Sequence, residues 1–206
     1  MNNINGLLDF YNEINKLKNT VRYNGADDIF KESTADHTWR LALMCIDLKE
    51  KNNIDIDITY AVKIALIHDM CEYQQNNDIT IVDVIDGRVT KKDKKKLELD
   101  TMKVLAERYS RNDIFEIWMD YENQNSKESK YVKLLDRMES TLHIIDRLGK
   151  DNFISNLDAV ATYCDKYIAN FPELIPVLRG IKDKLKVKFI RIGIEWKMEY
   201  DMFDNL

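Results

Sequence analysis

The chain has three histidines, and two of them stand beside carboxylates within otherwise apolar segments. Asp36 precedes His37 in TADHTWRLALM, and His68 precedes Asp69 in AVKIALIHDMCEY. A charged group in an apolar core is costly unless it is compensated, and a divalent cation supplies that compensation directly. The two pairs therefore predict a buried metal site.

Asp136 is a further candidate ligand, because it follows apolar positions of an expected helix in YVKLLDRMES. Taken singly, each candidate has an ordinary alternative: a polar group at a helix start, a satisfied core pair or a surface carboxylate. The ordered set of His37, His68-Asp69 and Asp136 favours the metal site, since helices can bring such separations together around one ion. Two imidazoles and two carboxylates suit Mn, Fe, Co, Ni or Zn, and they leave room for water or substrate oxygens.

Glu72 lies four positions after His68 and three after Asp69, so on a continuing helix it projects from the same face. From there it can handle the proton of an attacking water or of a leaving group, as a general acid or base. The structural alternative is an ion pair with Lys63 or another charge of the helix. Spacing alone leaves both alternatives open.

The elements that position these residues are expected to be helices. Only Pro172, Pro176 and six glycines interrupt the chain, and apolar residues recur at three-and-four spacing through most of it. This pattern predicts an all-α fold, with one compact bundle over residues 1–206. The expected helices are Asn3–Asn19, Asp36–Lys51, Thr59–Gln74, Lys91–Tyr109, Asp113–Asn123, Ser129–Leu148, Asn156–Asn170 and Leu174–Asp201. The clearest loops are Asn52–Asp57 and Gln75–Gly87.

The second expected helix shows how a ligand is turned inward. Thr34 and Asp36 are plausible caps for its start. Its buried stripe would then consist of Leu41, Met44, Cys45 and Leu48. This orientation places His37 one turn before the stripe, facing the core.

Composition limits the class of protein. With 206 residues, of which 45% are hydrophobic and 33% charged, the chain can bury the core of one domain. A net charge of -5 argues against a general nucleic-acid binder. No apolar stretch approaches the roughly 18 to 20 residues of a membrane helix, and Met1–Asp9 lacks a signal pattern. We therefore expect a cytoplasmic protein without a membrane partner, with Cys45, Cys71 and Cys164 as reduced thiols.

Longer segments carry a family resemblance. They are INKLKNTVRYNG around Arg22, KESTADHTWRLALM around His37, ALIHDMCEY and NDIT within Ala65–Thr80, and IWMDYENQNSKESKYVKLLDRME over Ile117–Glu139. In these segments the chain resembles the HD-domain phosphohydrolases, named for their His-Asp doublet. The resemblance is greatest to the branch containing bacterial 5'-deoxynucleotidases and the eukaryotic HD domain-containing protein 2. It covers most of residues 14–139, which would form the motif-bearing core of a single HD domain, followed by C-terminal helices over residues 140–206.

The resemblance implies an enzyme that holds one divalent metal ion, removes phosphate from (deoxy)nucleoside 5'-monophosphates and works as a homodimer. Carried over residue by residue, it places the metal ligands on His37, His68, Asp69 and Asp136. The remaining matched polar residues are Arg22, Glu72 and Asp78.

Roles for these matched residues follow from their chemistry. Arg22 would bind the phosphate, because a guanidinium donates two parallel hydrogen bonds to phosphate oxygens. Glu72 would transfer a proton. Asp78 would bind a sugar hydroxyl or orient Arg22, or else cap the next turn. Trp39 is a candidate for the substrate pocket, although aromatic residues on helices are mostly core.

Two alternative functions remain. The chain could be an HD hydrolase that acts on nucleoside triphosphates, cyclic nucleotides or alarmones, but those substrates generally require extra basic groups. It could also be a non-catalytic metal-binding module. Glu72 and Arg22 argue against the module, because a purely structural metal site needs no proton-transfer group.

Overall fold

The structure is a computed structural model, and it describes residues 4–22, 31–74, 84, 87–149 and 156–205. The α-helices are α1 (Ile4–Ile14), α2 (Thr34–Lys51), α3 (Ile58–Ile67), α5 (Lys91–Tyr109), α6 (Asn112–Asn123), α7 (Lys127–Arg147), α8 (Leu157–Ala161), α9 (Asp165–Ile168) and α10 (Ile175–Arg191). Short 3-10 helices are η1 (Asn15–Lys18), η2 (Met70–Gln74), η3 (Pro172–Leu174) and η4 (Met198–Asn205). An isolated β-bridge joins Val21 and Ser33. The predicted all-α fold is confirmed.

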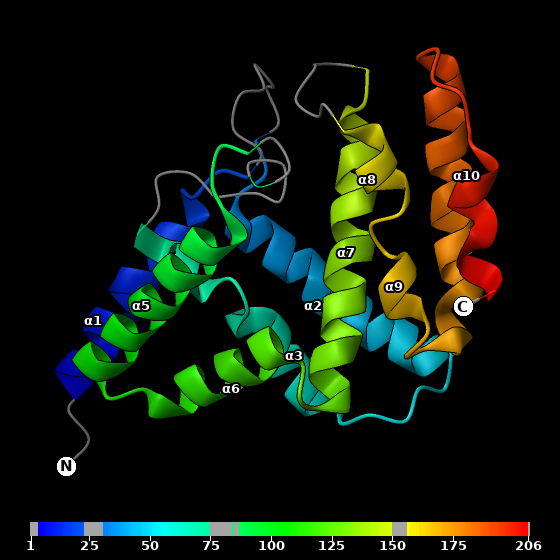
Figure 1. Cartoon of the computed structure of the whole chain (residues 1–206). Coiled ribbons are helices and arrows are strands. Elements are labelled where there is room, and N and C mark those ends of the chain that lie inside the picture. The colour runs from blue at the N-terminus through cyan, green and yellow to red at the C-terminus, as the bar shows by residue number, and fades with distance from the viewer. Residues whose placement is uncertain (1–3, 23–30, 75–83, 85–86, 150–155, 206) are drawn as a thin grey trace.

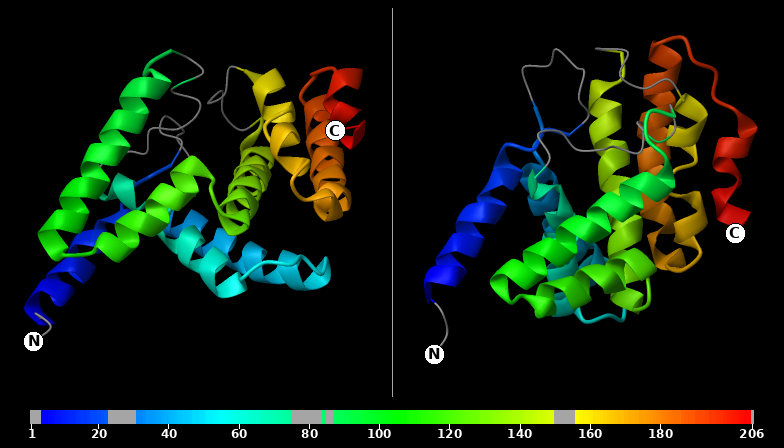
Figure 2. Two further views of the ribbon diagram at one scale, coloured as in Figure 1. Left: turned by 60° about the horizontal axis from the view of Figure 1, so that its bottom comes forward. Right: turned by 60° about the vertical axis from the view of Figure 1, so that its left-hand side comes forward.

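Helix α7 runs through the middle of the molecule (Figure 1). Helices α2 and α3 pack against α7 and against each other. Helices α9 and α10 also contact α7 and lie to its right in Figure 1. To the left of α7 in that view, α5 contacts both α1 and α6 (Figure 2). The segments that carry the candidate ligands therefore meet where α2, the end of α3 and α7 come together.

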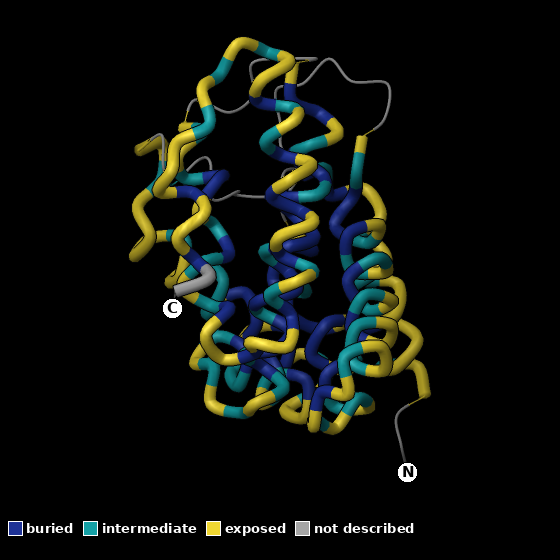
Figure 3. The backbone as a smooth tube through the Cα atoms, turned by 90° about the vertical axis from the view of Figure 1, so that its right-hand side faces the viewer, coloured by how far each residue is buried: buried dark blue, intermediate teal, exposed yellow. Residues whose placement is uncertain are grey.

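Helix α7 is buried over most of its circumference. Its buried apolar residues include Tyr131, Val132, Leu134, Leu135 and Met138. Figure 3 shows the buried backbone positions gathered in the interior, where the helices meet. The same helix also carries the buried polar residues Asp136, Glu139 and Ser140. Since buried polar groups need partners, α7 brings groups that require a ligand or a hydrogen bond into the interior.

The start of α2 turns His37 into the core. Ser33 is the N-cap: its hydroxyl accepts a hydrogen bond from the Asp36 amide at 3.2 Å, and Asp36 Oδ2 accepts from the Ser33 amide at 2.9 Å. This reciprocal capping box corrects the expectation that Thr34 caps the helix, while Asp36 does take part. The expected apolar stripe is confirmed, since Leu41 and Cys45 are buried and Met44 and Leu48 partly so.

Helix α3 ends earlier than the predicted Thr59–Gln74. His68 Nδ1 donates to the Ala65 carbonyl oxygen at 2.8 Å, and Trp118 Nε1 donates to the His68 carbonyl oxygen at 3.1 Å. Both oxygens would otherwise accept the i+4 amides of a continuing α-helix. The backbone instead tightens into η2, in which the Glu72 amide donates to the Asp69 carbonyl oxygen at 3.0 Å. Side-chain donors at the site thus decide where this helix stops.

The predicted helix Leu174–Asp201 ends at Arg191 in α10. Gly193 adopts a φ of +79°. The Ile194 amide donates to the Phe189 carbonyl oxygen at 2.9 Å, which gives a Schellman termination.

Two other predicted helices are also broken. Asn156–Asn170 is divided into α8 and α9, and at the break the Thr162 hydroxyl donates to the Asp158 carbonyl oxygen at 3.0 Å. Such side-chain bonds compete with helix propagation. Asn3–Asn19 is α1 followed by η1. None of the described helices is long and apolar enough to cross a membrane. The division into a core over 14–139 and C-terminal helices over 140–206 stays a prediction.

Candidate metal centre

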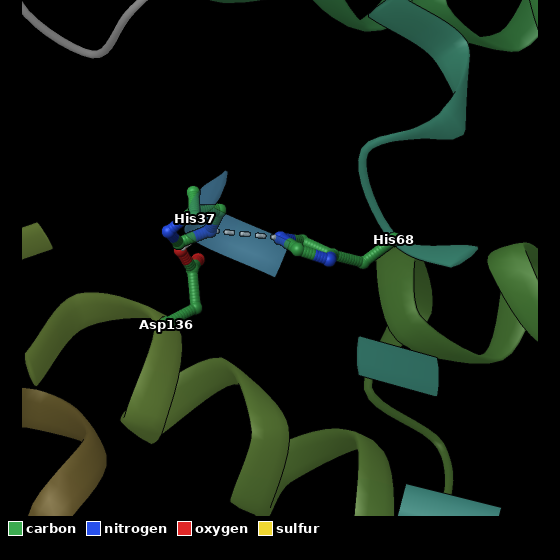
Figure 4. A group of neighbouring side chains, drawn as sticks. All are labelled: His37, His68 and Asp136. Carbon is green, nitrogen blue, oxygen red and sulfur yellow. Dashed lines mark hydrogen bonds and ion pairs between the residues drawn. The ribbon is translucent and has the colours of Figure 1, made fainter. Parts of the chain in front are cut away.

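Three structural elements bring the predicted ligands together. His37 comes from the first turn of α2, His68 and Asp69 directly follow α3, and Asp136 lies in the middle of α7. Figure 4 shows the Asp136 carboxylate pointing to the His37 ring, and the His37 ring facing His68. His37, His68 and Asp136 are all buried, and each offers a ligand atom to the same small space. These side chains, separated by up to 99 positions in the sequence, lie together, and their role as metal ligands stays a prediction.

The distances suit a single ion. His37 Nε2 lies 3.3 Å from His68 Nε2, 3.5 Å from Asp136 Oδ1 and 3.7 Å from Asp69 Oδ2. Asp69 Oδ2 lies 3.0 Å from His68 Nε2. Ligand atoms held about 2.1 Å from a divalent ion stand about 3.0 Å apart at a right angle and about 3.4 Å apart at the tetrahedral angle. His37, His68 and Asp136 could therefore hold a metal ion with nitrogen and oxygen ligands, and Asp69 lies close enough to His68 to be a further candidate ligand.

The protonation of the two rings shows that a cation is required between them. His68 Nδ1 must carry a hydrogen, because its partner is the carbonyl oxygen of Ala65 at 2.8 Å. His37 Nδ1 donates to Glu139 Oε2 at 2.5 Å. In the neutral rings both Nε2 atoms then present lone pairs to each other across 3.3 Å. A cation, either a proton on one ring or a metal ion between them, is needed to satisfy this arrangement.

Asp136 is held by groups on the side away from the rings. Its Oδ2 accepts a hydrogen bond from the Tyr121 hydroxyl at 2.8 Å, and Lys133 Nζ lies 4.0 Å away. Burial raises the pKa of this carboxyl, but Arg137, the contact with His37 and Lys133 together hold the pKa well below its ordinary range. Asp136 is therefore ionised, with Oδ1 directed at His37.

Asp69 connects the ligand set to Arg22. The Arg22 Nη1 atom lies 4.0 Å from Asp69 Oδ2, and its Nη2 donates to Ser140 Oγ at 3.2 Å. Burial raises the pKa of Asp69, but His68, His37 and Arg22 lower it below the usual range. The Arg22 guanidinium is buried beside the ligands, which places a fixed positive charge next to the ion position.

Glu72 is buried in η2, the 3-10 helix that begins just after Asp69. A 3-10 helix has three residues per turn, so side chains at i and i+3 lie on the same face. Asp69 and Glu72 therefore still lie on the same face, although α3 has ended before them. The Thr34 hydroxyl donates to Glu72 Oε2 at 2.8 Å, which anchors the carboxylate at the start of α2, one turn before His37.

The comparison with known proteins agrees with this geometry. The profile of a family described as HD domain matches residues 14–170. The chain belongs to the HD-domain family.

Two curated relatives show how far this HD domain is shared. The 5'-deoxynucleotidase HDDC2 of Mus musculus is 31% identical over 144 residues, which is 66% of this chain and 67% of the relative. The 5'-deoxynucleotidase YGK1 of Saccharomyces cerevisiae is 32% identical over 154 residues, or 70% of this chain and 68% of the relative.

Two solved structures share the fold of this HD domain. The PH0347 protein from Pyrococcus horikoshii OT3 has a TM-score of 0.66 and 24% identity, covering 86% of this chain and 99% of that one. A protein described as a predicted metal-dependent phosphohydrolase, from Magnetospirillum magnetotacticum MS-1, has a TM-score of 0.68 and 22% identity, covering 91% and 97%. At these identities the likeness shows the fold alone.

Asp78 and Trp39 are the other predicted substrate residues of the HD domain. Asp78 lies outside the described residues. Trp39 is 68% exposed on α2, two positions after the fully buried His37 and thus on a different helix face. Its place in a substrate pocket stays a prediction.

Glu139 and its partner Arg40 were not predicted from the sequence as parts of the site. Glu139 is fully buried and contacts both His37 and Arg40. Burial raises the pKa of Glu139, but His37, Arg22 and Arg40 lower it to about 2, so the carboxyl is ionised. A signal was present: Glu139 follows Asp136 by three residues and therefore shares its face of α7.

Proposed function

We propose that this chain is a metal-dependent phosphohydrolase that removes phosphate from (deoxy)nucleoside 5'-monophosphates. One observation carries the proposal: the buried His37, His68 and Asp136 lie beside the partly exposed Asp69, whose Oδ2 is 3.0 Å from His68 Nε2 and 4.0 Å from Arg22 Nη1. This combination suits a phosphate ester, because it offers positions for a metal ion and a fixed positive charge beside each other. The substrate class is supported by the relatives from mouse and yeast, both 5'-deoxynucleotidases by name.

The proposed cofactor is one divalent ion, with His37, His68, Asp69 and Asp136 as its protein ligands. Their nitrogen and oxygen donors suit Co, Mn, Ni, Fe or Zn. When bound, such an ion polarises a phosphoryl oxygen and makes a water molecule more acidic.

The protein's own side chains would do the rest. We assign phosphate binding to Arg22, whose planar guanidinium can donate two parallel hydrogen bonds. Glu72 would take the proton of the attacking water or return it to the 5'-oxygen of the leaving nucleoside, because its carboxylate is buried and held by Thr34. Asp78 and Trp39 remain our proposals for contacts with the sugar and the rest of the nucleoside.

Three cations other than Arg22 lie near the centre. Arg40 is already bound to Glu139 and to Glu32, with Arg40 Nη2 3.1 Å from Glu32 Oε1. Lys133 donates to the Tyr121 hydroxyl at 3.0 Å. Arg137 stacks on the Tyr163 ring at 4.3 Å and lies 3.9 Å from Asp136. These three cations have anionic or aromatic partners, as Arg22 has in Asp69, and we assign none of the three to a longer phosphate chain.

A substrate panel tests the proposal. The purified chain, loaded with Co²⁺ or Mn²⁺, is incubated with deoxynucleoside and nucleoside 5'-monophosphates, nucleoside triphosphates, cyclic nucleotides and guanosine tetraphosphate, and phosphate release is followed. We expect release from the 5'-monophosphates and its loss in His68→Ala. Turnover confined to a triphosphate, a cyclic nucleotide or the alarmone would contradict the substrate assignment. No turnover of any of them, with metal bound, would favour the non-catalytic module.

We further propose that the protein is a homodimer. This proposal rests on the family resemblance.

A further inference from the structure

Glu139 contacts a metal ligand from the side opposite the ion position. Its Oε2 accepts the hydrogen of His37 Nδ1 at 2.5 Å, and its side chain is fully buried. His37 Nε2, on the other edge of the ring, is the atom that lies 3.5 Å from Asp136 and 3.3 Å from His68. The hydrogen bond from Nδ1 therefore decides which nitrogen of His37 faces the ligand set and how the ring is turned.

Glu139 is itself held in place. Arg40 Nε donates to Glu139 Oε1 at 2.5 Å, and Arg40 Nη2 contacts the same oxygen. Arg40 Nη2 also donates to Glu32 Oε1 at 3.1 Å, and His143 Nδ1 lies 3.2 Å from that oxygen. One carboxylate oxygen of Glu139 is thus fixed by Arg40, while the other receives His37.

The same contacts argue against a second ion at this place. Glu32, His37 and Glu139 are close enough to one another to offer three ligand atoms. However, the Arg40 guanidinium already contacts both Glu32 and Glu139, so its charge opposes a cation there. Glu139 is therefore better placed to support a ligand than to act as one.

The two histidines are supported differently. His68 Nδ1 donates to a backbone carbonyl, that of Ala65, which the helix holds in place. His37 depends on a side chain from another helix, so its support can be removed by one substitution. Outer partners of metal-binding histidines fix the tautomer and raise the basicity of the ligand nitrogen, and their loss typically weakens metal binding by roughly 10-fold to 100-fold.

We propose that Glu139 is a positioning residue, which presents His37 Nε2 to the metal ion and tightens its binding. The inference rests on the proposed metal centre, but it is independent of the substrate. Its test therefore measures the ion and not only turnover.

The probe is Co²⁺, titrated into metal-free protein and followed by calorimetry and by visible absorption, which reports the ligand geometry. In Glu139→Gln we expect the dissociation constant for Co²⁺ to rise by about 10-fold to 100-fold with an altered spectrum. The matched control is Arg40→Gln, which breaks the same Arg40–Glu139 pair but leaves the hydrogen bond to His37. The dissociation constant of Arg40→Gln for Co²⁺ should stay much closer to that of wild type. If the Arg40–Glu139 ion pair only stabilised the fold, the two variants should weaken Co²⁺ binding equally.

A measurement on wild type keeps the inference testable if a variant does not fold. In the Zn²⁺-loaded protein, nitrogen-15 NMR should show His37 with a hydrogen on Nδ1 and the metal on Nε2. A metal-bound Nδ1, two Co²⁺ ions per chain or unchanged Co²⁺ affinity in Glu139→Gln would each overturn the positioning role. If Glu139→Gln weakens Co²⁺ binding but the wild type hydrolyses no nucleotide, the positioning role stands and the proposed function fails.

Discussion

The metal-free protein should lose stability as the pH rises from 7 to 9, because His37 then loses its proton. Burial and Arg22 lower the pKa of His37, but Glu139 and Asp136 outweigh them and raise it from 6.5 to about 9. The raised pKa means that the folded state binds this proton more tightly than the unfolded chain does. The resulting stability is fully present below about pH 6.5 and disappears as the pH rises through about 9.

The size of the effect follows from these two pKa values. Their difference of about 2.5 corresponds to about 3 kcal/mol for the full transition, at 1.36 kcal/mol for each pKa unit. Between pH 7 and pH 9 the linkage gives a loss of about 2 kcal/mol. For a chain of 206 residues, about 2 kcal/mol corresponds to a decrease in melting temperature of about 4–8 °C.

Thermal unfolding at pH 7, 8 and 9 provides the assay. The chain is measured with EDTA, with saturating Co²⁺, and as His37→Gln. The loaded protein should show a shallower decrease in this window, since the ion takes the place of the proton at His37 Nε2. His37→Gln without metal should also decrease less than wild type, because only other groups, such as the buried Cys45 and Cys164 thiols with their raised pKa values, then reduce stability near pH 9. An equal slope in His37→Gln, or a metal-free wild type whose melting temperature does not fall, would refute the reasoning.

The other predictions concern ligands, proton transfer, phosphate binding and assembly. His68→Ala and Asp136→Ala should each weaken Co²⁺ binding in calorimetry, and chelation should abolish turnover; full activity after exhaustive chelation would reject the metal mechanism. Glu72→Ala should keep its Co²⁺ and substrate affinity but lose about 100-fold to 10,000-fold in turnover, measured by phosphate release; near-normal turnover would return Glu72 to a structural role. Arg22→Ala should weaken phosphate binding as well as turnover, because its charge contacts the ground state too; an unchanged KM would count against this assignment. Light scattering at micromolar concentration should give a dimer mass, and a mass near 24.4 kDa would exclude it.

Local signals predicted much of the fold. The expected helix Lys91–Tyr109 has the bounds of α5, because Thr90 caps its start and Ser110 adopts the left-handed conformation at its end. The end of α3 was not predictable in this way. Besides the local bond from His68 to Ala65, it involves a hydrogen bond from Trp118, which lies 50 residues further along the chain. A helix cap can be predicted from neighbouring residues in the sequence. A hydrogen bond from a distant indole to a backbone carbonyl oxygen cannot be predicted in this way.

The candidate ligands could be picked out from the sequence because they are unusual for their surroundings, while their role as metal ligands stays a prediction. A His-Asp doublet inside an apolar helical segment is costly to bury unless a partner compensates its charge. The structure brings His68 and Asp69 to His37 and Asp136. Glu139 offered only its spacing of three residues from Asp136, which is a weak signal because a glutamate on a charged helix is ordinarily exposed. Its burial depends on how α2 packs on α7, which the sequence pattern does not specify.

The arrangement on α7 links metal binding to the packing of two helices. Asp136 and Glu139 are one turn apart on α7, and both reach the same imidazole from α2, at Nε2 and Nδ1 respectively. A shift of α2 relative to α7 would therefore disturb the ligand and its support together. Leu41 and Leu135, both fully buried in the shared core, help to fix that relation. We therefore expect an accurately placed metal ligand at His37 to depend on apolar packing several residues away as much as on the carboxylates that touch it.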